Sequence, residues 1–355
     1  MRNSKIFLVI TALLLCLSCE KITKTTERDE LPAPDYNGII PIYRFYIGEP
    51  MAAGFILLNA IEQYYADDNK ADPAKVLSPD SDMISECQKK LFENACINNI
   101  RFRENYNDLL DNSMMACCDV FNALLYYNII VAWGDFPYAE NSSAALDREN
   151  AVRNNSRNIL TALADDLEKA MACLEDKRYP YDDPNESMSV SKDIARILLA
   201  DIHMYLGEYS KAGTLLKQVI DSGYYSLEGN GSVILGLYAG IPESDSYPDI
   251  LLQTYAGVML SYAECLYVQN DLQDAEDCLK QVLESSGLAS DYDDILSGIA
   301  SARMKLLDDC VGNFAFMKRS GLFSSWYGMD ETYMLLPLPN DMLVTYSGFM
   351  QNPGY

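Results

Sequence analysis

The chain has 355 residues and a formal net charge of −25 at pH 7, with 52 Asp and Glu against 27 Lys and Arg. A surface this acidic repels nucleic acid and anionic lipid headgroups, so we expect no nucleic-acid partner and no polyanionic ligand. The length is enough to bury a large core in one domain or two.

The first residues carry a targeting signal. Arg2 and Lys5 make the start of the chain positive, and residues 6–17 form an apolar run. This run is long enough for the core of a signal peptide and too short to span a bilayer. We therefore predict that residues 1–18 are a signal peptide.

A lipid attachment site follows the apolar run. Ser18 precedes Cys19, and a small residue before a cysteine at this place is typical of a lipoprotein cleavage site. We expect Cys19 to carry the lipid and residues 19–38, which are polar and contain two prolines, to form a lipidated tether. Two acyl chains anchor a protein stably in a membrane. An ordinary secretory signal beside a structural cysteine is the alternative.

Helical periodicity dominates from Ile39 onward. The spacing of apolar residues predicts helices over residues 54–65, 82–100, 109–131 and 159–174. The third of these is apolar on nearly every face, which predicts a central, buried helix ending at Gly134. Asn122 and Asn128 interrupt its most apolar part, so we expect no membrane span there and a chain held to the membrane by its lipid alone.

The middle of the chain contains an internal repeat. The pentapeptide LKQVI at residues 216–220 recurs as LKQVL at residues 279–283, 63 positions later. Each copy predicts a helix, a tight turn at Gly207 or Asn270, and a second helix, as in tetratricopeptide hairpins. The same offset pairs small residues that would let the two helices approach closely: Ala200 with Ala263, and Ala212 with Ala275. Gly223 and Gly287 follow the second helices, where a left-handed cap is favoured.

The remaining segments are less regular. Residues 226–248 predict a loop with a short strand, and residues 300–310 predict a helix. Residues 314–355 are aromatic and rich in Gly and Pro, which predicts an irregular segment packed on the helices. The predicted fold is therefore one mainly α domain over residues 39–355, with tetratricopeptide-like hairpins as the scaffold and irregular aromatic loops packed on them.

Five segments, in order, carry a resemblance to a known family. They are 127–137 (YNIIVAWGDFP), the hairpin 196–224, 260–265 (LSYAEC), 336–339 (LPLP) and the ending 351–355 (QNPGY). Together with the lipoprotein start, this set resembles the SusD/RagB family of outer-membrane nutrient-binding lipoproteins, and the chain is similar to a short member of it. The ending is the most specific of these motifs.

The resemblance implies a function and a location. It implies a lipid-anchored protein on the outer face of the outer membrane that captures nutrients, most often oligosaccharides. It also implies delivery of them to a TonB-dependent, SusC-like transporter. The connection between the hairpins, residues 226–249, is shorter than the family pattern. This leaves open an alternative, a tetratricopeptide-like interaction subunit (a transporter lid or a peptide binder) without a glycan site.

Sugars are bound by flat aromatic faces, with amide and carboxylate groups on the hydroxyls. The candidate ligand contacts are therefore aromatic residues in predicted loops, or at positions that break the helical spacing of apolar residues. The predicted ligand-binding residues are Phe102, Asn105, Tyr106, Tyr238, Tyr247, Trp326 and Tyr327, with Asn107 beside the first three. Trp133 closes a buried helix, so we interpret it as structural.

The sequence does not favour catalysis. Acidic pairs such as Asp165-Asp166 are expected by chance among 52 acidic residues, and no G-x-S-x-G elbow is present. The one histidine, His203, lies within a predicted helix, and the eight cysteines after Cys19 are interpreted as small buried hydrophobes. Residues 181–186 offer several oxygens without the EF-hand spacing, which indicates a solvated turn. We predict a binding protein that is not an enzyme, with no cofactor and no metal site.

The lipid site can be tested directly. Replacing Cys19 with Ser removes the thiol, so incorporation of labelled palmitate should fall to background and the protein should leave the membrane fraction. Cys16→Ser, three positions earlier, is the matched control and should keep full labelling. Unchanged labelling of the Cys19→Ser chain would show that Cys19 is not the lipid attachment site.

Overall fold

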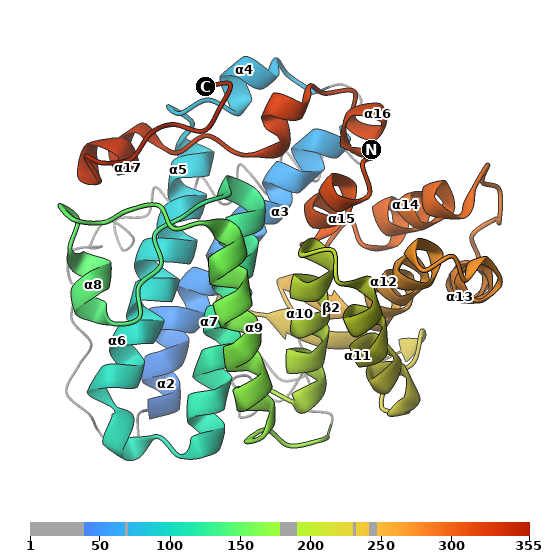
Figure 1. Ribbon diagram of the computed structural model, residues 1–355, viewed down its shortest axis with the longest axis horizontal. Coiled ribbons are helices and arrows are strands. Elements are labelled where there is room, and N and C mark those ends of the chain that lie inside the picture. The colour runs from blue at the N-terminus through green and yellow to red at the C-terminus, as the bar shows by residue number, and fades with distance from the viewer. Residues whose placement is uncertain (1–38, 68–69, 178–189, 230–231, 241–246) are drawn as a thin grey trace.

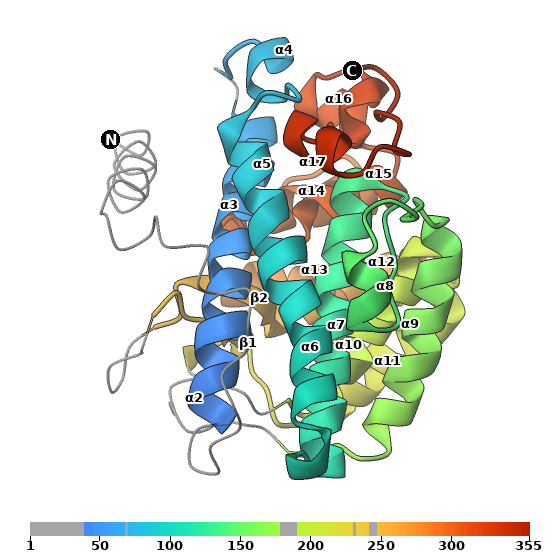
Figure 2. The same ribbon diagram turned by 90° about the vertical axis from the view of Figure 1, so that its left-hand side faces the viewer.

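The computed structural model describes residues 39–67, 70–177, 190–229, 232–240 and 247–355. The predicted signal peptide, the tether with Cys19, and the turn at 181–186 lie outside the described residues. Figure 1 shows a mainly helical protein with one small sheet, and Figure 2 shows the long helices of the N-terminal half side by side. The predicted fold class is confirmed.

Two long, nearly continuous helices form one side of the molecule. The first joins α2 (Ile39–Tyr43), a π-helical turn (Arg44–Gly48) and α3 (Glu49–Ala66), and the second joins α5 (Asp82–Gln88), a π-helical stretch (Lys89–Cys96) and α6 (Ile97–Asn105). The short α4 (Pro73–Val76) lies between them. Gly54 lets the two helices approach, since a Cβ there would lie 2.6 Å from Leu91 Cδ2. Both helices extend beyond the predicted ranges.

The central helix is α7 (Asn112–Trp133), preceded by a 3-10 turn at Asn107–Leu109. Asp111 caps it by accepting from the Met114 backbone N–H at 2.8 Å. Every residue from Val120 to Trp133 is buried, as its apolar faces predict. Within the described part of the chain, α7 is long and apolar enough to cross a membrane by length and composition, but it lies mostly inside the protein as a core helix.

The end of α7 is buried, so its last four carbonyl groups need donors. Gly134 N donates to Ile130 O at 2.8 Å, and Leu336 N donates to Ala132 O at 2.8 Å. The Lys318 ammonium donates to Val131 O. Asn352 Nδ2 donates to Trp133 O at 2.9 Å and to Leu336 O at 2.7 Å. The motifs after α7 and at the end of the chain therefore meet in space.

The predicted repeat is confirmed as two helical hairpins. The first consists of α10 (Lys192–Tyr205) and α11 (Tyr209–Asp221), and the second of α12 (Tyr255–Val268) and α13 (Leu272–Ser285). The turn residues Gly207 and Asn270 have φ angles of 84° and 64°, the left-handed conformation that the pattern requires. The four alanines of the helix crossings are fully buried. Figure 1 shows α9 (Ser156–Met171) beside the first hairpin, and α8 (Ser142–Leu146) lies further out.

The other segments differ from the predictions in detail. The connection holds an antiparallel pair, β1 (Val233–Leu237) and β2 (Ile250–Thr254), where one short strand was predicted. The predicted helix at 300–310 begins earlier, as α14 (Ile295–Leu306), because Asp294 and Ser297 form a capping box.

The predicted irregular C-terminal segment is packed on the helices but contains short helices. They are α15 (Asn313–Arg319), α16 (Phe323–Tyr327), a 3-10 turn (Glu331–Met334) and α17 (Asn340–Thr345). Gly321 and Gly328 have φ angles of 72° and 63°, so each ends a helix and keeps it short.

The contacts of Asn352 predict a large loss of stability on substitution. Asn352→Ala removes both donors of a buried amide and leaves the Trp133 and Leu336 carbonyls less satisfied. We expect the free energy of unfolding in urea to fall by about 2–4 kcal/mol. Met350→Ala, at a neighbouring side chain that is 80% exposed, should leave it within about 0.5 kcal/mol. Equal stabilities of the two variants would contradict this role of Asn352.

Candidate functional site

Three of the predicted ligand residues are core side chains. Phe102 and Tyr106 are each 1% exposed, and Tyr327 is 3% exposed. Phe102 packs edge-on against Tyr43 with ring centroids 4.9 Å apart, and Tyr327 packs against Phe323 at 5.3 Å. Because other rings cover them, these side chains present no face to a sugar in this structure, and packing explains their aromatic character.

The other predicted ligand residues reach solvent, but they do not form one site. Tyr247 is 60% exposed, Trp326 is 38% exposed, Tyr238 is partly exposed, and Asn105 and Asn107 are exposed. Tyr238 follows β1 and Tyr247 precedes β2. In Figures 1 and 2, α6 ends at the bottom of the molecule, whereas α16 lies at the top. Asn105 and Trp326 therefore cannot contact one small ligand together.

The residues interpreted as structural have structural contacts. Trp133 is fully buried, and its Nε1 donates to Pro337 O at 3.1 Å. His203 is 6% exposed, with Nδ1 2.8 Å from Glu208 Oε2 at the turn of the first hairpin. The eight cysteines after Cys19 are free thiols, and only Cys173 is exposed.

A polar cavity of about 60 Å³ lies where α7, α10, α12, α14 and β2 meet. Asp201, Gln253, Ser261, Arg303 and Arg319 supply its polar lining. Ligand pockets for drug-sized molecules measure roughly 300–1,000 Å³, so this cavity holds a few waters or a small polar group and cannot hold an oligosaccharide.

Buried charges surround this cavity. Arg319 forms a two-point ion pair with Glu264, with Nε–Oε1 at 2.6 Å and Nη2–Oε2 at 2.7 Å. Arg303 Nη2 donates to Ser261 Oγ at 2.6 Å, whereas Arg303 Nε and Gln253 Oε1 have no partner among the described residues. Burial raises the pKa of Asp201 to about 6, against the opposing effect of the two arginines. The charges balance, which suits a structural polar centre.

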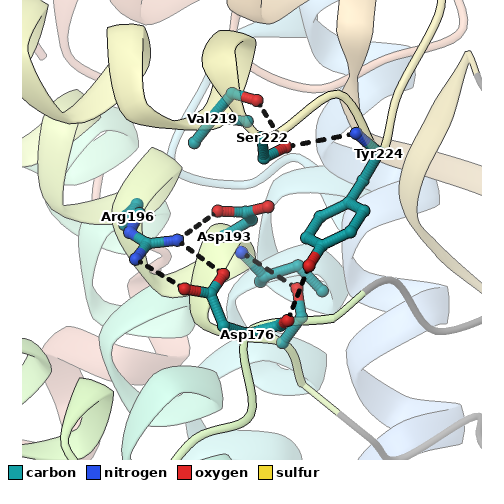
Figure 3. Close-up of polar contacts among 8 residues, drawn as sticks. Asp176, Asp193, Arg196, Val219, Ser222 and Tyr224 are labelled. Atoms are coloured by element: carbon teal, nitrogen blue, oxygen red, sulfur yellow. Dashed lines mark hydrogen bonds and ion pairs between the residues drawn. The ribbon is translucent and has the colours of Figure 1, made fainter.

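A second polar cluster joins the start of α10 to the end of α11. Figure 3 shows the Arg196 guanidinium between two carboxylates, donating to Asp193 Oδ1 at 2.6 Å and to Asp176 Oδ1 at 3.1 Å. The Tyr224 hydroxyl donates to Asp176 O at 2.9 Å, and its backbone N–H donates to Ser222 Oγ at 3.3 Å. The cluster therefore holds Tyr224 in place although its side chain is 42% exposed.

Four tyrosines lie beside the contact between α11 and α12, and we call Tyr224, Tyr225, Tyr255 and Tyr262 the tyrosine strip. Tyr224 is 42% exposed and Tyr255 and Tyr262 are partly exposed, whereas Tyr225 is buried behind Tyr255 with 8% of its surface exposed. Tyr225 stacks on Tyr255 with ring centroids 6.3 Å apart and an interplanar angle of 27°. Tyr224 meets Tyr225 edge-on at 6.4 Å. The strip was not among the ligand residues predicted from the sequence, although the seven-residue spacing of Tyr255 and Tyr262 places both on one face of a helix.

Among the described residues, no group of three or more His, Cys, Asp or Glu could hold a metal ion. The cavity carboxylate of Asp201 faces two arginines, which stabilise its charged form, and no second carboxylate lines the cavity to act with it.

The raised pKa of Asp201 predicts a pH dependence of stability. Between about pH 4 and pH 6 the folded protein keeps a proton that the unfolded chain loses, so this group makes stability fall as pH rises through that window. Asp201→Asn should remove this component, on the order of 2 kcal/mol, in urea unfolding measured from pH 4 to pH 7. Asp291→Asn, at an exposed aspartate, should keep the wild-type slope. Identical slopes in all three proteins would refute the assignment.

Comparison with known proteins identifies the fold. No protein-family model matches the chain, and no curated protein matches it in sequence. A SusD superfamily protein from Bacteroides vulgatus matches in structure with a TM-score of 0.70 and 11% identity, over 90% of this chain and 98% of that one.

Two further structural matches are named for what they bind. Surface glycan-binding protein A from Bacteroides thetaiotaomicron matches with a TM-score of 0.65 and 13% identity, over 90% of this chain and 98% of that one. A laminarin-binding SusD-like protein matches with a TM-score of 0.60 and 15% identity, over 85% and 98%. The five motifs and this agreement across most of the chain lead to one conclusion: the protein has the fold of the SusD superfamily.

Proposed function

We propose that this chain is a cell-surface lipoprotein that captures a neutral oligosaccharide and delivers it to a TonB-dependent, SusC-like transporter in the outer membrane. The observation that carries the proposal is the shared fold. It extends over about nine-tenths of this chain and includes a structure named as a surface glycan-binding protein. In this proposal Cys19 anchors the chain in outer-membrane lipid, with the domain facing the cell exterior.

The surface chemistry supports a neutral ligand. The formal net charge of −25 opposes the approach of acidic polysaccharides. Aromatic rings that remain at the surface can stack on the C–H faces of sugar rings, which carry no net charge. The exposed members of the predicted set, Asn105, Tyr238, Tyr247 and Trp326, stay candidate contacts in this proposal, and binding requires no catalytic group or cofactor.

The alternative function is a tetratricopeptide-like interaction subunit. The two hairpins α10–α11 and α12–α13 favour it, because such hairpins commonly present helical surfaces to protein partners. In this alternative the chain docks on its transporter, or binds a peptide, and has no glycan site.

A calorimetric titration distinguishes the two functions. The purified full chain in detergent would be titrated with laminarihexaose, maltohexaose, mannohexaose and xylohexaose, and with a mixed-sequence hexapeptide. We expect at least one sugar to bind with a Kd below about 1 mM, corresponding to about −4 kcal/mol. If none of the four sugars binds, glycan capture is overturned. Binding of the peptide alone would favour the interaction subunit.

A further inference from the structure

Resting on the proposed function, we infer that the tyrosine strip, which lies on α12 and just after α11, is the principal oligosaccharide contact of this protein. Of the exposed aromatic residues predicted from the sequence, Tyr238 and Tyr247 flank one end of the β1–β2 pair, and Trp326 lies on α16. In the strip, ring contacts join Tyr224, Tyr225 and Tyr255, and Tyr262 lies two helical turns from Tyr255 on α12. Figure 1 shows the helices that carry it at the right-hand side of the molecule.

The strip is long enough for more than one sugar ring. Tyr255 and Tyr262 are seven residues apart on α12, which places them on the same face, about 10 Å apart along the helix axis. Tyr224 and Tyr225 continue the strip beyond Tyr255 through the stacked and edge-on contacts. A linear array of rings at this scale suits an extended chain of sugars better than a single compact ligand.

Local packing holds the rings in position. Tyr262 packs beside α11, with its Cε2 4.0 Å from the place of a Gly213 Cβ. Tyr255 is held by its stack on Tyr225, and Tyr224 by its bond to Asp176. Because these rings are ordered before a ligand arrives, stacking a sugar on them costs little conformational entropy.

Polar groups beside the strip complement sugar hydroxyls. The hydroxyls of Tyr255 and Tyr262 are not buried and have no hydrogen-bond partner in the described part of the chain. Lys217 and Asp221 form an ion pair on the adjacent face of α11, with their side chains 50% and 59% exposed. Burial raises the pKa of both tyrosines, and the nearby Asp221 carboxylate raises it further.

These groups define the ligand class. They offer hydrogen-bond donors and acceptors next to aromatic faces, and the Lys217–Asp221 pair has no net charge. An acidic polysaccharide would meet the negative field of the whole protein. A neutral oligosaccharide is the ligand that uses the rings, the hydroxyls and the ion pair together.

The test measures the affinity of the full chain for the tightest-binding hexasaccharide of the four named above. Tyr262→Ala and Tyr255→Ala should each weaken binding about five- to tenfold, because each removes a stacking face. Tyr262→Phe keeps the ring and should lose less than about threefold. Lys217→Ala changes only an exposed ion pair, so it should fold normally and bind about two- to fivefold more weakly.

The control is Phe45→Ala, at a ring that is 43% exposed on the long N-terminal helix, and it should bind like the wild type. Trp326→Ala tests the predicted aromatic residue on α16. Wild-type affinity in all the strip variants, or a loss of affinity in Trp326→Ala alone, would show that the strip is not the site, while glycan capture stands. Failure of the wild type to bind any of the four sugars would overturn the proposed function and the strip with it. Peptide binding that depends on the strip would overturn the ligand class.

Discussion

The buried end of α7 is the constraint on which the closure of this chain depends. An apolar helix that ends inside a protein leaves carbonyl groups that water cannot reach, and each needs a donor. Gly134, Lys318, Leu336 and Asn352 supply these donors, and Arg153 adds a bond of 3.2 Å to the Trp133 carbonyl. Gly134 directly follows α7, whereas Lys318, Leu336 and Asn352 come from distant parts of the sequence. Capping one helix therefore determines where the whole C-terminal segment lies.

Buried charged groups also fix the position of the C-terminal segment. The Glu62 carboxylate on α3 accepts from the backbone N–H groups of Gly312 and Phe314 at 3.2 and 3.3 Å, at the start of α15. Burial raises the pKa of Glu62 to about 7 and lowers that of Lys318, whose ammonium lies 3.8 Å from the Phe314 ring centroid. Taking these charges out of water is costly, and the hydrogen bonds and the aromatic face offset part of that cost.

This arrangement separates stability from binding. The buried ion pair of Arg319 on α15 with Glu264 on α12 joins α15 to the second hairpin beside the cavity. The tyrosine strip lies on α12 and just after α11, and three of its four rings are partly exposed. The partly exposed rings of Tyr224, Tyr255 and Tyr262 lie outside the contacts of the buried alanines that join the helices of each hairpin. A rigid helical scaffold thus presents a surface that can change without loss of the core.

Local patterns determined the helices, and tertiary packing decided which aromatic residues face solvent. The repeat at residues 216–220 and 279–283 predicted both hairpins and their left-handed turns, because helix periodicity and turn conformation depend on near neighbours in the chain. The central helix followed from its apolar faces, and the family motifs indicated the fold. Phe102, Tyr106 and Tyr327 lie where the helical pattern is interrupted. The distant rings of Tyr43 and Tyr65 nevertheless pack on Phe102 and Tyr327, and Phe102 in turn packs on Tyr106. Whether a ring is covered, or a carbonyl such as Trp133 O finds Asn352, depends on residues far apart in the sequence that only the folded chain brings together.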